Sequence, residues 1–384
     1  MKPFGPAGWL ARICLFLVVA SITGLFQLDR QARTQTDLAA IVPVGLGGFA
    51  DERMIERLAI IAPDQALGRA EQLLHHRPTD AHNLGIFALS AVEAGDSERA
   101  GRALTLAAQR GWRDPYTQVS VTGSALAQQQ WEVAAQRIDA LARTRREQET
   151  IFAALRYMLA EPEGRVEIAK RLVVSEPLAA ALAEFTRANG DFPNEVAAVL
   201  KATHAKSGDA GVSCANYARI VRALLAQSEG VAALQAWPAA CASGSREGIA
   251  FAFTEGSDDP FAWTFPSVAG VSVNDGNAPG AIDIRNRDLL RRQVAFRYLV
   301  LTPGRYSLRI ERSAKRGEGF AGGPSAQFSV LLRCDRRGGN ASGALINGNY
   351  DAPITFSILP DCPIQFVSLT ASQGRADDVR VFLD

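Results

Sequence analysis

The sequence repeats a short pattern at an interval of 34 residues: residues 66–73 read ALGRAEQL, residues 100–107 read AGRALTLA and residues 134–141 read AAQRIDAL. Three columns stay in phase at this interval: Ala66, Ala100 and Ala134; Ala70, Leu104 and Ile138; Leu73, Ala107 and Leu141. Small residues recurring in one column are typical of positions where paired helices cross closely. The pattern therefore predicts a stack of helix–turn–helix units, best defined over residues 63–143.

The segment around these repeats, residues 51–244, is predicted to be helical throughout. Apolar residues recur at intervals of three and four, and frequent breaks place Pro or Asp at helix starts and Gly at helix ends. Connections this short predict that consecutive helices run antiparallel.

This helical segment resembles tetratricopeptide repeats. Leu84, Ala88 and Ala91 match the first helix of a repeat, Gly95-Asp96 its turn, Ala100, Leu104 and Ala107 its second helix, and Pro78 the end of the preceding repeat. Gln118 and Thr122 depart from the pattern, and the columns drift after Glu147, so we expect the later helices to be degenerate repeats. The resemblance implies a concave helical surface that binds a protein partner.

Three of the four histidines lie in LLHHRPTDAH, residues 73–82. In the repeat register His75 and His76 end one helix, Thr79 or Asp80 caps the next, and His82 lies in its first turn. Adjacent side chains on a helix point about 100° apart, which is a poor geometry for one metal ion. We therefore interpret the cluster as a junction between repeats, and we predict neither a metal nor a cofactor.

From residue 245 onward the pattern changes to about nine short apolar runs separated by turns rich in Gly, Asn, Asp and Pro. Many short strands without intervening helices predict an antiparallel, jelly-roll-like β-sandwich. The segment Thr302-Pro303-Gly304 separates VAFRYLVL (294–301) from RYSLRIE (305–311), which predicts that these two runs form a hairpin. The fold class is thus α plus β and multidomain.

The N-terminal region contains an uncharged run from Ile13 to Leu28, which the segment beginning at Trp9 extends. A run of this length can cross a bilayer as a helix. No small-x-small cleavage site follows it, because Ile22, Leu25 and Phe26 occupy that region. We expect an uncleaved anchor through residues 9–28, although the nearly balanced positive charges on its two sides do not orient it.

Four of the five cysteines fall into two local pairs, Cys214 with Cys241 and Cys334 with Cys362, while Cys14 lies in the anchor. No Cys-x-x-Cys is present, which argues against structural zinc. As disulfides, each pair would close a loop of nearly thirty residues and stabilise its domain by about 3–4 kcal/mol in an oxidising compartment. The alternative is four buried free thiols. The pairing favours a single-pass protein of the bacterial inner membrane with its body in the periplasm.

We therefore expect a cytoplasmic tail and anchor (1–30), a linker (31–50), helical repeats (51–244) and a β-sandwich domain (245–384). Six segments contribute to a wider resemblance: RGWRDPYTQ (110–118), DPFAWTF (259–265), LLRRQ (289–293), LTPGRYSLRIE (301–311), LLRC (331–334) and PDCPIQFVSLT (360–370). With them, the chain resembles membrane-anchored tetratricopeptide-repeat-type proteins of Gram-negative bacteria that end in a carbohydrate-binding-like β-sandwich and are associated with envelope or exopolysaccharide gene clusters. The resemblance implies assembly or recognition.

Candidate glycan contacts lie in the predicted sandwich. The aromatic candidates are Trp263, Tyr298, Tyr306 and Tyr350, although strand aromatics often face a core instead. Arg291 and Arg292 belong to a basic patch with Arg285 and Arg287 that could meet an anionic polysaccharide, or could simply be solvated. The acids Glu255, Asp258 and Asp259 could hydrolyse a glycan or bind calcium, but a solvated turn is the simpler interpretation.

The charge balance excludes one class of function. Lys plus Arg number 41 and Asp plus Glu number 40, so no global field attracts nucleic acid. Two hypotheses remain: a non-catalytic scaffold with a protein partner on the repeats and a possible polysaccharide on the sandwich, or an envelope polysaccharide-modifying enzyme with a jelly-roll catalytic domain. The lack of a recognisable catalytic motif favours the scaffold.

Overall fold

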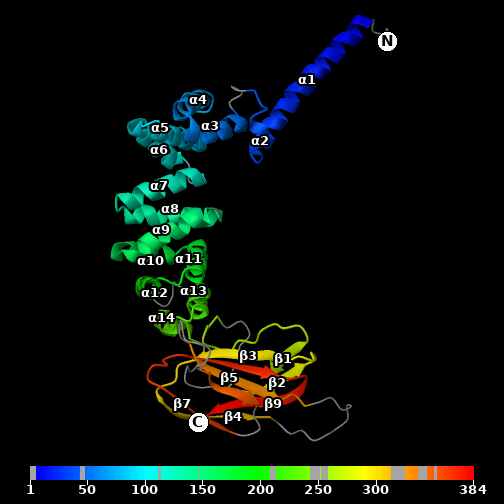
Figure 1. The fold of residues 1–384 in the computed structure, drawn as a ribbon, viewed down its shortest axis with the longest axis vertical. Helices are drawn as coiled ribbons and strands as arrows, with labels where there is room; N and C mark the ends of the chain where they lie inside the picture. The colour runs from blue at the N-terminus through cyan, green and yellow to red at the C-terminus, as the bar shows by residue number, and fades with distance from the viewer. Residues whose placement is uncertain are drawn as a thin grey trace. The chain divides into compact units, whose positions relative to one another are not determined.

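The computed structural model describes residues 6–43, 48–110, 114–145, 147–207, 213–242, 251, 258–312, 325–335, 344–349 and 353–384. Within these ranges the chain forms fourteen α-helices, one short 3-10 helix and nine strands in two antiparallel sheets, which confirms an α plus β fold (Figure 1). Contacts divide the chain into two compact units, Met1–Ala154 and Leu155–Asp384. The domain boundary expected after residue 244 stays a prediction.

The first unit begins with the apolar helix α1 and continues as paired helices. Its elements are α1 (Pro6–Ala32), α2 (Thr36–Ala39), α3 (Phe49–Ile61), α4 (Pro63–His76), α5 (Ala81–Glu93), α6 (Ser97–Arg110), α7 (Pro115–Ala127), α8 (Trp131–Thr144) and the start of α9 (Gln148–Ala160). Helices α4, α6 and α8 begin at Pro63, Ser97 and Trp131, so the 34-residue interval of the sequence is also the interval between equivalent helices. The first column, Ala66, Ala100 and Ala134, is buried.

The two polar residues that depart from the repeat pattern are buried in α7 and bonded. The Gln118 side-chain oxygen accepts a hydrogen bond from Arg137 of α8 over 3.2 Å, and the Thr122 hydroxyl donates to the Gln118 carbonyl over 2.6 Å. A polar contact between α7 and α8 therefore occupies positions where we expected apolar packing.

Helix α1 contains a stretch, Trp9–Ala32, that is long and apolar enough to cross a membrane. Its last turns belong to the folded unit, because Leu28 and Ala32 pack with Ala39, Val42 and Ala50. The segment expected as a linker thus contributes α2 and part of a small apolar core.

The helices of the second unit do not keep the interval of the first. They are α10 (Pro162–Leu172), α11 (Glu176–Ala188), α12 (Pro193–Ser207), α13 (Cys214–Ala226), α14 (Gly230–Ala236) and the 3-10 helix Ala239–Cys241. The 34-residue interval between equivalent helices therefore ends with the first unit, and the interpretation of the later helices as degenerate repeats stays a prediction. The disulfide Cys214–Cys241, with Cα atoms 5.6 Å apart, ties the start of α13 to this 3-10 helix.

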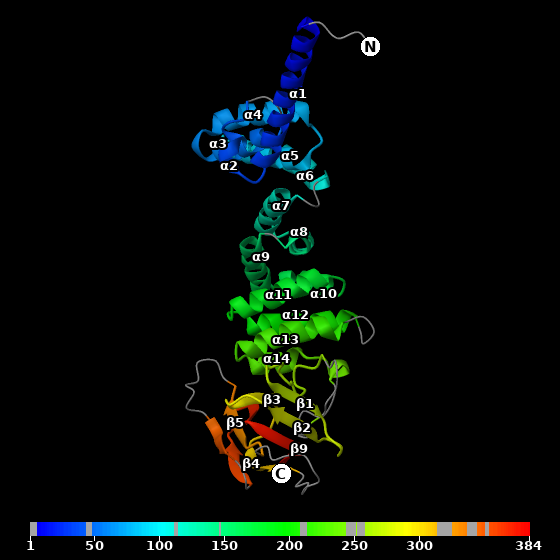
Figure 2. The same cartoon turned by 90° about the vertical axis from the view of Figure 1, so that its right-hand side faces the viewer.

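The two sheets also belong to the second unit (Figure 2). The strands are β1 (Val271–Asp275), β2 (Ile282–Asn286), β3 (Arg292–Leu299), β4 (Gly304–Glu311), β5 (Phe328–Cys334), β6 (Ala344–Asn349), β7 (Ile354–Ile358), β8 (Gln365–Ala371) and β9 (Gly374–Leu383). One sheet has the order β1-β2-β9-β4-β7 and the other β3-β8-β5-β6. Alternating residues of both sheets, such as Ile284, Leu308, Val330 and Val367, contribute to one apolar core.

The predicted hairpin between β3 and β4 is wrong. Strand β3 pairs with β8, whereas β4 pairs with β7 and β9 in the other sheet. The connection stays attached to β8 because the Leu301 N–H donates to the Gln365 side-chain oxygen over 2.9 Å. The turn signal is therefore genuine, but each strand buries its apolar face by joining a different sheet.

Contacts of Gly230 and Arg222 join the helices of the second unit to its β region. Gly230, the first residue of α14, lies so close to Ile364 that a Cβ there would be 3.0 Å from the Ile364 side chain. The Arg222 guanidinium of α13 donates to the Asp258 carbonyl over 3.1 Å.

A second disulfide, Cys334–Cys362, has Cα atoms 5.5 Å apart and links the end of β5 to the segment before β8. Both predicted cysteine pairs thus lie at disulfide distance.

Candidate functional site

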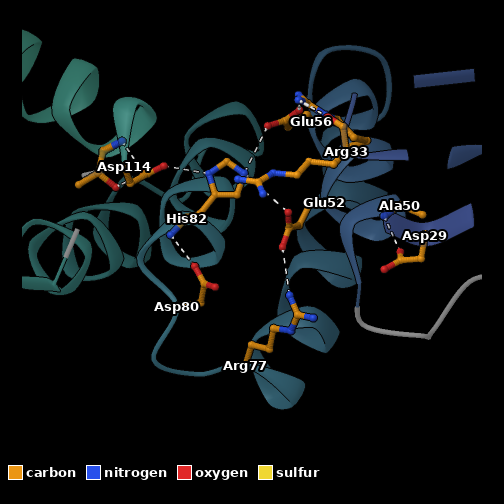
Figure 3. Close-up of polar contacts among 11 residues, drawn as sticks. Asp29, Arg33, Ala50, Glu52, Glu56, Arg77, Asp80, His82 and Asp114 are labelled. Atoms are coloured by element: carbon orange, nitrogen blue, oxygen red, sulfur yellow. Dashed lines mark hydrogen bonds and ion pairs between the residues drawn. The ribbon is translucent and has the colours of Figure 1, made fainter. Parts of the chain in front are cut away.

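At the histidine-rich junction, His82 lies at the centre of a cluster of charged side chains. Figure 3 shows His82 between Asp114 on one side and Glu52 and Glu56 on the other. His82 Nδ1 lies 3.0 Å from Asp114 Oδ1, and Nε2 lies 3.9 Å from Glu52 and 3.8 Å from Glu56. Arg77 adds a contact of 3.6 Å to Glu52. The cluster draws on α3, the end of α4, α5 and the start of α7, so it fastens three successive helix pairs.

Helix capping positions His82 and Asp114, the two residues at the centre of the cluster. Asp80, one of the two caps expected from the sequence, is the N-cap of α5 and accepts a hydrogen bond from the His82 N–H over 2.9 Å. Asp114 is the N-cap of α7 and accepts from the Thr117 N–H over 2.8 Å. The two aspartates lie 34 residues apart, so each caps the first helix of its own 34-residue repeat.

The cluster perturbs the protonation of its members. The hydrogen bond to Asp114 raises the pKa of His82, although burial alone would lower it. Burial raises the pKa of Glu52, against the attraction of His82 and Arg77. Burial would also raise the pKa of Asp114, but the hydrogen bonds from His82 and Thr117 outweigh it and lower that pKa. The arrangement favours a protonated His82 and thus binds a proton at a helix junction.

Sequence reasoning missed most of this cluster. It placed His82 correctly in a first helical turn, and the 34-residue spacing of Asp80 and Asp114 is a signal that could have brought Asp114 to His82. Nothing in the sequence points to Glu52, because α3 lies before the repeat becomes regular. Among the described residues no group of three or more His, Cys, Asp or Glu side chains is arranged to hold a metal ion.

A cavity of about 230 Å³ lies among the helices of the second unit, between the α10–α11 turn, α12 and α13. Its apolar walls include Leu172, Leu200 and Ile220, and Val174 at the α10–α11 turn is 70% exposed. Polar groups line it from several elements: Ser175 and Glu176 at the start of α11, Thr203 of α12, and Ser213 and Asn216 at the start of α13. Apolar walls with a few polar groups are typical of a ligand-binding cavity.

The polar groups of this cavity are unequally available. The Tyr217 hydroxyl donates to the Leu200 carbonyl over 3.1 Å, and burial raises the pKa of Tyr217 to about 12. Tyr217 is therefore a neutral part of the wall. The Asn216 side chain, by contrast, forms no hydrogen bond to another residue within the described part of the chain, so its amide can pair with an incoming peptide group.

The aromatic glycan candidates occupy different environments. Trp263 is 7% exposed, its ring centroid lies 4.6 Å from that of Phe251, and the Arg297 guanidinium lies over it at 5.7 Å. This placement in the core leaves no open ring face for a sugar. Tyr306 also packs against the core, 5.8 Å from Phe356, and its hydroxyl donates to the Thr302 carbonyl over 2.9 Å. Tyr350 lies outside the described residues.

Tyr298 differs from Tyr306 because it is not among the residues of the shared core or packed against it. Its cross-strand partner is Phe366, at 5.3 Å between ring centroids, and the Arg333 guanidinium lies 5.2 Å from the Phe366 ring. Tyr298 is half-buried, and burial raises its pKa to about 12. Tyr298, Phe366 and Arg333 together form an aromatic surface on the four-stranded sheet.

The charged candidates are mostly engaged. Arg292 forms an ion pair with Asp288 (2.5 Å), and exposed Arg291 donates to the Gln327 carbonyl over 3.2 Å. Of the three acids, buried Asp259 accepts from the Phe261 N–H over 2.9 Å, Asp258 is exposed, and Glu255 lies outside the described residues. The structure does not gather these acids around a groove within the ranges it describes.

Comparison with known proteins adds no relative. No family model matches this chain, and a search of curated proteins finds no significant match.

Proposed function

We propose that this protein is a non-catalytic, membrane-anchored scaffold whose body lies in the bacterial periplasm. In this proposal the helices form a tetratricopeptide-like solenoid that binds a protein partner. The two sheets form a jelly-roll-like sandwich that docks onto a glycan or a second partner, in polysaccharide synthesis or export. The membrane-length helix α1 and the two disulfides are compatible with this location.

The observation that carries the scaffold proposal is the cavity beside α13. Its volume of about 230 Å³ suits one large side chain. A sugar is a poorer match, because it favours exposed aromatic faces, and the aromatic residue of the lining, Tyr217, is 2% exposed. An apolar side chain of a partner between the cavity walls, with its backbone amide paired to Asn216, satisfies both kinds of lining group.

A photo-crosslinker tests this proposal. We would place p-benzoylphenylalanine at Val174 in the full chain and, as a control, at Val231 of α14, which is 45% exposed. Irradiation of cells should give one discrete adduct from position 174 and none from position 231. In chains without the crosslinker, Val174→Asp should abolish co-purification of the same partner, whereas Val231→Asp should not. Identical adducts from both positions, or none from position 174, would contradict the proposal.

The surface formed by Tyr298, Phe366 and Arg333 supports glycan docking as the role of the sandwich. Half-buried rings beside a guanidinium can stack on sugar rings and hydrogen-bond to their substituents. Tyr298→Ala should weaken binding of the full chain to an envelope polysaccharide, while Tyr306→Phe, which removes only the hydroxyl of a core-packed tyrosine, should not. Equal binding by all three proteins would remove the glycan role. The enzyme alternative stays a prediction without a site.

A further inference from the structure

The loop between β2 and β3 presents two leucines to solvent. Leu289 is 84% exposed and Leu290 is 60% exposed, and Leu289 is the most exposed large apolar side chain in the described part of the chain. Both values are high for side chains whose burial is favourable by about 1.5–3 kcal/mol each. A loop without other constraints would fold such residues back onto the protein.

A hydrogen-bonded frame prevents this collapse. The Asp288 N–H donates to Asn286 Oδ1 over 2.9 Å, and the Leu290 N–H donates to Asp288 Oδ1 over 3.0 Å. The Asn286 amide, 2% exposed, donates to the carbonyls of Leu290 and Ala371, each over 3.0 Å. Arg292 holds the other carboxylate oxygen of Asp288. The fold therefore fixes the two leucines outward.

The flanks of this loop are basic. Arg285, Arg287 and Arg291 are exposed, and none of their guanidinium groups forms an ion pair with a described residue. The one acid of the loop, Asp288, is neutralised by Arg292. The surface thus combines a protruding apolar tip with three positive charges.

We propose that this loop and the adjoining strand ends, residues 285–292, bind the surface of an anionic phospholipid bilayer. The leucines would enter the boundary between headgroups and acyl chains, and the arginines would pair with lipid phosphates. An anionic polysaccharide would satisfy the arginines equally well but would leave both leucines in water, so the apolar tip favours lipid. The inference rests on the proposed membrane anchoring through α1, which would keep the chain at a bilayer.

The test uses the full chain with Cys14→Ser and a single added cysteine, Leu289→Cys, labelled with the polarity-sensitive fluorophore NBD. The chain is placed in nanodiscs of phosphatidylcholine alone or mixed with phosphatidylglycerol, with and without nitroxide lipids. Leu359→Cys, at a position that is 57% exposed just after β7, is the matched control site. We expect a blue shift and nitroxide quenching for the probe at 289 in anionic discs, and neither at 359.

Charge variants sharpen the result. Arg285→Gln and Arg287→Gln should each lower the ratio of inserted to free loop by about fivefold in anionic discs. A probe at 289 that stays in water in both kinds of disc overturns the inference, as does a probe that responds to soluble anionic polysaccharide and not to lipid. A chain that stays outside the discs overturns the anchoring instead. Adding vesicles of both compositions to that chain then tests the loop by the same readout.

Discussion

The carboxylate of Asp29 accepts a hydrogen bond from the backbone N–H of Ala50 over 2.9 Å and so fastens the end of α1 to the first turn of α3. Asp29 is 8% exposed, and a Cβ on Gly48 would overlap its carboxylate. The free N–H groups and the dipole of a helix N-terminus favour an anion there. The membrane-length helix is thus joined to the body by a buried polar contact as well as by apolar packing.

Replacing Asp29 tests this junction. Asp29→Ala should destabilise the first unit by about 1–2 kcal/mol, because the α3 N-terminus loses a charged acceptor in a buried setting. Hydrogen exchange of the amides at the start of α3 should accelerate. Asp37→Ala, which removes an exposed acid from α2, should leave those amides unchanged. Equal exchange in the two variants would mean that Asp29 does not hold α3.

The close approach of α9 and α10 depends on Gly164. A Cβ at this buried glycine would lie on the carbonyl group of Met158, which belongs to the backbone and cannot move away cheaply. We expect Gly164→Ala to lower the free energy of unfolding by about 1–3 kcal/mol. Gly101→Ala, on α6 with open space around the new methyl, should raise it by about 0.5–1 kcal/mol. Urea unfolding of the two variants checks the opposite signs.

Loss of the proton from His82 should make the first unit less stable at high pH. The hydrogen bond to Asp114 raises the folded-state pKa of His82 above its unfolded value of 6.5. The resulting stabilisation is fully present below about pH 6.5 and is lost as the pH rises through the folded-state pKa. Thermal unfolding of His82→Gln should therefore show a deficit of about 0.5–1 kcal/mol near pH 6 that shrinks toward pH 9.

His76→Gln is the control for this pH dependence, since His76 is an exposed residue at the end of α4. Its unfolding curve should follow the wild type at every pH. A deficit of His82→Gln that is independent of pH would indicate lost packing and contradict a role for the charge.

The two disulfides should each stabilise the second unit by about 3–4 kcal/mol, because each closes a loop of nearly thirty residues in the unfolded chain. Replacing Cys334 and Cys362 together by Ser should lower the unfolding midpoint, as should the same change at Cys214 and Cys241. Cys14→Ser, at an exposed position of α1, should have no effect. Peptide mapping without reductant should recover both links, and free thiols at all four positions would refute them.

The proposed topology places the C-terminal residue Asp384 outside the cytoplasm. Alkaline phosphatase fused after Asp384 should be active, because it folds only where its disulfides form. A fluorescent protein that matures only in the cytoplasm should stay dark at the same position. The reverse pair of results would place the body in the cytoplasm and withdraw the periplasmic assignment.

Local patterns in the sequence determined a large part of this structure. The column Ala66, Ala100 and Ala134 predicted the spacing of equivalent helices, because a small residue is required wherever helices cross closely. Capping chemistry narrowed the cap of α5 to Thr79 or Asp80 and placed His82 in the first turn of that helix. The two cysteine pairs were correctly matched because each lies within one stretch of chain. The apolar run in α1 was equally clear, since a membrane-length segment is a property of composition alone.

Only the tertiary structure decided which distant groups meet. Residues 294–311 carry a true turn signal, yet β3 and β4 join different sheets because strand pairing is set by which faces the whole β region can bury. Glu52 reaches His82, and Asp29 reaches Ala50, across separations that no local pattern encodes. The exposure of Leu289 is likewise invisible in the sequence, where two leucines indicate a core. It follows from the buried Asn286 amide and the Asp288 carboxylate, whose hydrogen bonds hold that loop away from the protein.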